Sequence, residues 1–156
     1  MIYVFDSNSL IKLGAFFPTR FPSLWKQVDD MVAAGTLVSV REVFRELDTY
    51  AEDDALLDWA NRNKHIFMPA VPEESLFVGK IFSVPHFRTL INKQSMLEGR
   101  PVADPFIVAS AKRFSGTVIT EERLKPQAAK IPNVCEHFGV PYLNLEEFMG
   151  KQGWKY

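Results

Sequence analysis

Cysteine, net charge and long apolar runs are all scarce in this chain of 156 residues. The single cysteine, Cys135, excludes an internal disulfide and suits a reducing compartment. The longest strongly apolar stretches, such as Phe106–Ala111, are far shorter than the ~20 residues that span a bilayer. The segment Met1–Asp6 has no basic leader and no long apolar core, so we expect no signal peptide, no membrane contact and a cytoplasmic location.

The formal net charge is only -1, which excludes a basic protein that binds polyanions over its whole surface. The charge is nevertheless uneven: residues 1–74 carry -5, residues 75–135 carry +5, and residues 136–156 carry -1. Such asymmetry is typical of a solvated surface, or of a chain in which one segment faces an anion.

The residues that are present describe an ordinary globular domain. Hydrophobic residues make up 47% of the chain and aromatic residues 13%, which excludes disorder and collagen. Short apolar runs alternate with longer segments of helical periodicity, so we expect an α/β fold: a single domain with three α/β/α layers and a central parallel sheet. The expected strands are Ile2–Phe5, Leu37–Val40, Thr117–Thr120 and Pro141–Asn144, and the expected helices are 21–34, 41–50, 53–64, 75–99 in two pieces, 103–114 and 145–151.

Acidic residues follow these strands at the edge where a parallel sheet carries its working site. Asp6 comes directly after the first strand, and Glu121 and Glu122 come directly after the third. Asp6 also suits a helix N-cap, and Asp104 suits the N-cap of a helix whose first residue is Pro105. Each acid therefore has a structural interpretation beside the functional one.

Glu42 and Glu46 lie four residues apart and share a helix face. On a helical wheel Glu46 flanks the apolar stripe, so we expect it to face a groove beside the sheet. Glu42 lies farther from the stripe, and we expect it to be solvated or paired with Arg41 or Arg45. One of Glu121 and Glu122 is expected to be a surface residue.

Carboxylates from several strand ends would repel one another unless a cation lies between them. Ligand sets made only of oxygen suit Mg²⁺ or Mn²⁺. The three histidines and Cys135 lack the spacing of a zinc site.

Four segments in order resemble the PIN-domain nucleases, particularly the VapC-type toxins. They are IYVFDSN (Ile2–Asn8), VSVREVFREL (Val38–Leu47), VADPFIVASA (Val102–Ala111) and TVITEE (Thr117–Glu122). The resemblance covers most of the chain and implies one PIN-like domain over residues 1–156, with a helix-rich insertion over about 53–100. It also implies an acidic pocket that binds Mg²⁺ or Mn²⁺.

Carried over by position, the resemblance assigns catalysis and metal binding to Asp6, Glu46, Asp104 and Glu122. It also matches Ser7 or Asn8 to the polar position after the first acid. The fourth acid of the family is more often Asp, so Glu122 is a departure and Glu121 is the alternative ligand.

The function that we expect is a metal-dependent endoribonuclease that leaves a 5′-phosphate and a 3′-hydroxyl. The resemblance further implies the toxin of a toxin–antitoxin pair, with an antitoxin as partner, and a homodimer to which Phe16, Phe17 and Trp25 could contribute. Besides Ser7 and Asn8, we expect Arg88 and Arg123 from the positive segment to contact RNA phosphates.

Two alternatives from other classes stay open. A phosphomonoesterase of the haloacid-dehalogenase type also places an Asp after its first strand, but it needs a second Asp two residues later, where this chain has Asn8. A catalytically idle binding module would use its acids only to cap helices.

Overall fold

A computed structural model describes residues 1–52, 54–90 and 103–156 of the chain. A five-stranded, entirely parallel sheet lies at its centre, in the order β3-β2-β1-β4-β5. The strands are β1 (Tyr3–Phe5), β2 (Leu37–Val40), β3 (Phe67–Met68), β4 (Thr117–Ile119) and β5 (Tyr142–Leu143). Because the chain builds β2 and β3 on one side of β1 and then β4 and β5 on the other, the strand order reverses between β1 and β4.

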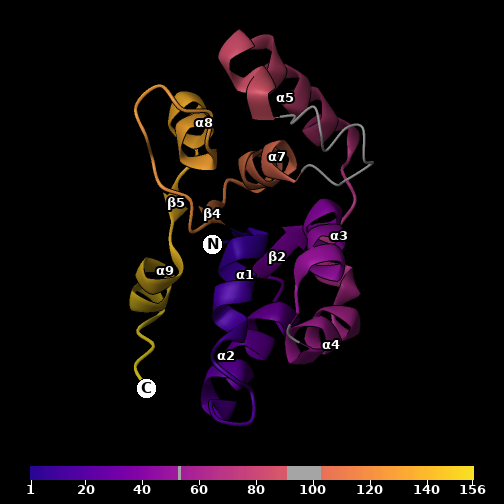
Figure 1. Cartoon of the computed structure of the whole chain (residues 1–156), viewed down its shortest axis with the longest axis vertical. Helices are drawn as coiled ribbons and strands as arrows, with labels where there is room; N and C mark the ends of the chain where they lie inside the picture. Colours follow the sequence, from indigo (N-terminus) through magenta and orange to yellow (C-terminus); the bar gives the residue numbers. More distant parts are fainter. Residues whose placement is uncertain (53, 91–102) are drawn as a thin grey trace.

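Helices cover both faces of the sheet, so the expected single-domain α/β architecture in three layers is confirmed (Figure 1). Helices α5, α7 and α8 lie on one side, and α1, α2 and α9 lie on the other. The helical segments are α1 (Ser7–Gly14), α2 (Pro22–Ala33), α3 (Arg41–Tyr50), α4 (Asp54–Arg62), η1 (Lys64–Ile66), α5 (Pro72–Ser83), η2 (Pro85–Leu90), α7 (Asp104–Phe114), α8 (Ile131–Phe138) and α9 (Leu145–Gln152). None of the helices in the described residues has the length and apolar character that crossing a bilayer requires.

Strand β1 is buried and its aromatic side chains anchor the last helix. The rings of Tyr3 and Phe5 lie edge-on to Phe148 of α9, with centroids 5.0 and 5.1 Å away. Such ring pairs stabilise a core beyond their buried area, by roughly 0.5–1.5 kcal/mol each. This packing fixes α9 beside the carboxyl end of the sheet.

Several elements differ from the sequence expectation. Strand β3 was not predicted, because two residues are too few to show a strand period; it pairs with β2 through Ser39 and Phe67. Helix α8 was not predicted either, and α1 was anticipated only through its cap. Of the helix expected over 75–99, residues up to 90 form α5 and η2, and the rest lies outside the described residues.

Candidate functional site

Asp6 lies at the point where the strand order reverses, directly after β1. It is only 3% exposed. Its Oδ1 accepts a hydrogen bond from the Ser7 amide at 2.8 Å, which caps α1, and its Oδ2 accepts one from the Thr120 hydroxyl at 2.9 Å. Burial, together with the charges of Glu122 and Glu46, raises the pKa of Asp6 to about 7, although both hydrogen bonds act against this shift. The N-cap interpretation of Asp6 is thus confirmed. The two hydrogen bonds do not outweigh burial and the neighbouring negative charges, so the pKa of Asp6 stays raised.

Glu46 reaches the same edge of the sheet from α3. Its Oε2 accepts a hydrogen bond from the Ser7 hydroxyl at 2.6 Å, so the residue after Asp6 links two of the predicted acids. Burial raises the pKa of Glu46, and the nearby charge of Glu122 raises it further, against the hydrogen bonds from Ser7 and the Ala103 backbone. The half-buried position agrees with the groove expected from the helical wheel.

Asp104 is the first residue of α7, and it does not cap that helix. Ala103 is the N-cap and no side chain caps the helix, so the N-cap interpretation of Asp104 is wrong. Burial raises the pKa of Asp104 well above its ordinary value, and Glu122, Asp6 and Glu46 raise it in that order. The charge of Lys130 acts in the opposite direction and lowers this pKa.

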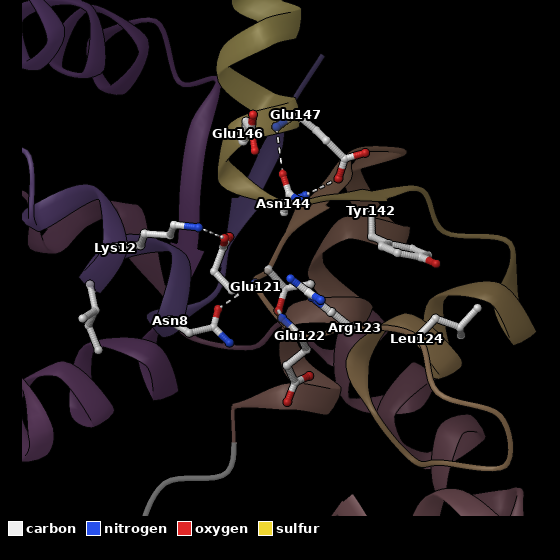
Figure 2. A pocket seen from close by; sticks show the side chains of 12 residues that line it. Asn8, Lys12, Glu121, Glu122, Arg123, Leu124, Tyr142, Asn144, Glu146 and Glu147 are labelled. Carbon is white, nitrogen blue, oxygen red and sulfur yellow. Dashed lines mark hydrogen bonds and ion pairs between the residues drawn. The ribbon is translucent and has the colours of Figure 1, made fainter.

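Glu121 and Glu122 are neighbours in the chain but point in different directions (Figure 2). Glu122 acts electrostatically on all three of the acids above, and its Oε2 accepts a hydrogen bond from the Ile131 amide at 2.9 Å. We call Asp6, Glu46, Asp104 and Glu122 the acidic cluster.

Glu121 is compensated by its own partners, away from the acidic cluster. Its carboxylate pairs with Lys12 at 3.1 Å and accepts hydrogen bonds from the Ser9 hydroxyl at 2.6 Å and the Leu145 amide at 2.9 Å. Burial raises the pKa of Glu121, but these contacts outweigh it and leave the pKa below its ordinary value. The geometry therefore favours Glu122 over Glu121 as the fourth acid.

The donor chemistry of the acidic cluster fits a hard divalent cation, because all its donors are carboxylate oxygens and three of its pKa values are raised. The side chains are not yet gathered around one point. Among the described residues, no three His, Cys, Asp or Glu side chains are arranged to hold a metal ion.

Glu42 differs from its expected solvated position. It pairs with Arg41 at 3.4 Å, as one of the alternatives predicted, yet it is only 5% exposed. Its Oε2 is buried and accepts no hydrogen bond from the described residues. Glu42 also raises the pKa of Glu46, so it adds negative charge behind the acidic cluster.

The four predicted substrate-binding residues occupy different positions. Ser7 is bonded to Glu46, and Asn8 accepts a hydrogen bond from the Glu121 amide at 3.1 Å through its side-chain oxygen. Arg123 is exposed beside Glu122. Arg88 is held in η2, where it donates to the Phe82 carbonyl, and no described contact joins it to the acidic cluster.

Thr120 is the functional residue that sequence reasoning missed. It is 1% exposed; its hydroxyl donates to Asp6 and accepts from the Glu122 amide at 3.2 Å, so it fixes the spacing of two acids. The sequence feature that could have indicated Thr120 is its position between the apolar strand and the acids Glu121 and Glu122. Lys130, before α8, was also missed, and its signal was only that it belongs to the positive segment.

Comparison with known proteins adds a family. A model described as "Domain of unknown function (DUF4411)" matches residues 3–156. The chain belongs to the DUF4411 family. No curated protein matches the DUF4411 chain in sequence. Among solved structures it is similar to the crystal structure of VapBC2 from Rickettsia felis bound to a DNA fragment from their promoter, with 14% identity, a TM-score of 0.49, and coverage of 92% of this chain and 98% of that chain.

Proposed function

We propose that this protein is a metal-dependent endoribonuclease of the PIN type, and that its acidic cluster holds Mg²⁺ or Mn²⁺. The observation that carries the proposal is the convergence of four carboxylates from four different segments at the strand-order reversal. Three of them have raised pKa values because burial and mutual repulsion disfavour their charge. If these acids served only as helix caps, bringing them close enough to repel one another would destabilise the fold with no benefit.

The chemistry follows from what such residues can do. A bound divalent ion supplies charge stabilisation for a phosphodiester and lowers the pKa of a coordinated water. Asp6 and Asp104, the two acids of the cluster whose pKa values are raised most clearly, would hold the ion, and Glu122 would complete the set. Ser7 keeps Glu46 in place, where Glu46 either joins the ligands or orients the attacking water.

Partners follow from the same proposal and from the resemblance to VapC-type toxins. RNA would be the substrate, and the exposed Arg123 beside Glu122 would contact one of its phosphates. A toxin–antitoxin role would add an antitoxin partner. For a homodimer, Phe17 is 57% exposed and available, whereas Trp25 is buried and packs against Trp59 of α4.

The test is cleavage of single-stranded RNA by the purified protein with Mn²⁺, compared with Asp6→Asn and Asp104→Asn. We expect each variant to lose at least roughly 100-fold in rate, as removal of a charge-stabilising group usually does. Asp30→Asn is the matched control, because Asp30 is exposed on α2 and its side chain pairs with Lys26 one helical turn away. Cleavage that survives both site changes would refute the proposal.

A further inference from the structure

A hollow of about 700 Å³ lies beside the acidic cluster, in the size range of ligand sites. It shares Glu122 with the cluster, and Thr120, which donates to Asp6, also lines it. From there the hollow extends to β5 and the start of α9 (Figure 2). Of the four acids of the cluster, the lining of this hollow includes Glu122, so most of its wall is made by other residues. Its walls carry the aromatic ring of Tyr142, the cations Lys12 and Arg123, and four carboxylates, of which Glu121 and Glu122 are described above.

The aromatic ring is Tyr142, on β5 at the edge of the sheet. It is half-buried and lines the hollow, and its hydroxyl donates to Glu136 at 3.0 Å. Among the described residues no other aromatic ring stacks on it, so its exposed face is open to the hollow. A ring held in this way is a stacking platform for an unpaired base, which such rings bind with little dependence on sequence.

Of the two cations, Arg123 lies between Tyr142 and Glu122 in Figure 2. It forms no ion pair or hydrogen bond with another residue of the described ranges. Lys12, on the opposite wall, is already paired with Glu121. Arg123 is therefore the cation of this hollow that is left to meet a phosphate.

The other two carboxylates are Glu146 and Glu147 of the first turn of α9. Glu147 closes the capping box of the helix, because it accepts from the Asn144 amide at 3.0 Å. Glu146 is exposed and has no partner within the described part of the chain. An ionised carboxylate only accepts hydrogen bonds, so it favours a base that presents an amino group.

We propose that this hollow binds one unpaired nucleotide of single-stranded RNA, with its base on Tyr142, its phosphate at Arg123 and its exocyclic amino group at Glu146. The inference rests on the proposed function, since the nucleotide lies next to the phosphate that the acidic cluster would cleave. It adds a base preference: cytosine over uracil, because the two are equal in size but carry an amino donor and a carbonyl acceptor at the same position.

The experiment measures binding rather than cleavage. Fluorescence anisotropy compares labelled C12 and U12 RNA in Mg²⁺ buffer at low temperature, with the RNA checked for intactness on a gel. We expect wild type to bind C12 roughly ten-fold more tightly than U12. Tyr142→Ala should weaken both by about ten-fold, whereas Tyr142→Phe, which keeps the ring and loses the bond to Glu136, should stay within about two-fold. Tyr156→Ala, at an exposed tyrosine far along the chain, is the matched control.

Glu146→Gln provides the second variant, because Glu146 is exposed and its change does not threaten the fold. Gln offers both a donor and an acceptor, so the C12-to-U12 affinity ratio should fall to about one. Glu73→Gln, on the exposed side of α5, should leave the ratio unchanged.

Folded Tyr142→Ala with unchanged affinity would overturn the inference, and so would an unchanged ratio in Glu146→Gln or equal wild-type affinities. If Tyr142→Ala does not fold, the ratio in Glu146→Gln decides. Cleavage by wild type without these binding effects refutes the inference and leaves the nuclease intact. The binding effects without any cleavage refute the nuclease and leave the nucleotide site intact.

Discussion

At the scale of single residues, two adjacent glutamates have opposite surroundings. Glu121 has an ammonium, a hydroxyl and a backbone amide as partners, and its pKa is lowered. Glu122 accepts one backbone hydrogen bond and adds its charge to three other acids. The contrast separates a carboxylate that stabilises the fold from one that is available to a ligand.

The raised pKa of Asp6 makes stability depend on pH in a definite direction. Its pKa is about 7 in the folded protein and near 3.8 in the unfolded chain, so between these values the folded state binds more protons. The stability of the metal-free protein should therefore fall as the pH rises from about 4 to 7. Thermal unfolding in EDTA between pH 5 and 8 measures this, and Asp6→Asn should show a shallower fall. A wild-type Tm that rises across this window would contradict the assignment.

Glu121 is not part of the acidic cluster, but the substitution Glu121→Ala should destabilise the protein. The change removes the acceptor for Ser9 and for the Leu145 amide, so we expect a loss of about 1–3 kcal/mol in the free energy of unfolding. Urea unfolding gives the value, and Glu146→Ala, at an exposed and unpaired glutamate, should stay within about 0.5 kcal/mol of wild type. Equal stability of the two variants would show that the contacts of Glu121 contribute nothing.

At the scale of elements, the pairing of β4 with β1 sets the distance between Thr120 and Asp6. Gly116 precedes β4 and lies against the Ile2 carbonyl, where a Cβ atom would collide with the carbonyl oxygen. The next amide, that of Thr117, donates to this same oxygen at 2.9 Å. The close approach of the two strands thus depends on glycine at this position.

Gly116→Ala should therefore lower the free energy of unfolding by about 1–3 kcal/mol, since overpacking forces the backbone to shift. Gly79→Ala is the matched control: Gly79 lies inside α5 with open space around it, so alanine should be neutral or stabilise by up to about 1 kcal/mol. Chemical denaturation compares the two. Equal effects at both positions would contradict the role of Gly116.

Elements with strong local patterns could be predicted from the sequence, and those held by distant contacts could not. The apolar run of β1 identified Asp6, which follows the strand directly. The run of β4 indicated Glu121 and Glu122 together, and only their contacts in the structure distinguish the two. The hydrogen bond that links Thr120 to Asp6 joins residues 114 positions apart in the sequence, so no local sequence pattern predicts it. Glu42 is buried by tertiary packing, although its place on the helical wheel predicts exposure.

At the scale of the whole molecule, parallel topology gathers acids that are far apart in sequence. Segments after β1, β2 and β4, together with the start of α7, all meet at the carboxyl edge of one sheet. The overall charge of -1 therefore hides a concentrated negative site beside a positive segment. A bound divalent cation would offset the negative charge of these acids. We therefore expect the cation to bind first and RNA to bind to the metal-loaded protein.

The most direct test of the central claim is calorimetric titration of the metal-free protein with Mn²⁺ near pH 8, where the raised pKa values still permit ionisation of Asp6. The proposal predicts saturable binding by wild type and by Asp30→Asn, and its loss in Asp104→Asn. Binding should weaken toward pH 5 as the cluster takes up protons. No saturable heat with wild type, or equal binding by folded Asp104→Asn, would contradict a metal centre at these acids.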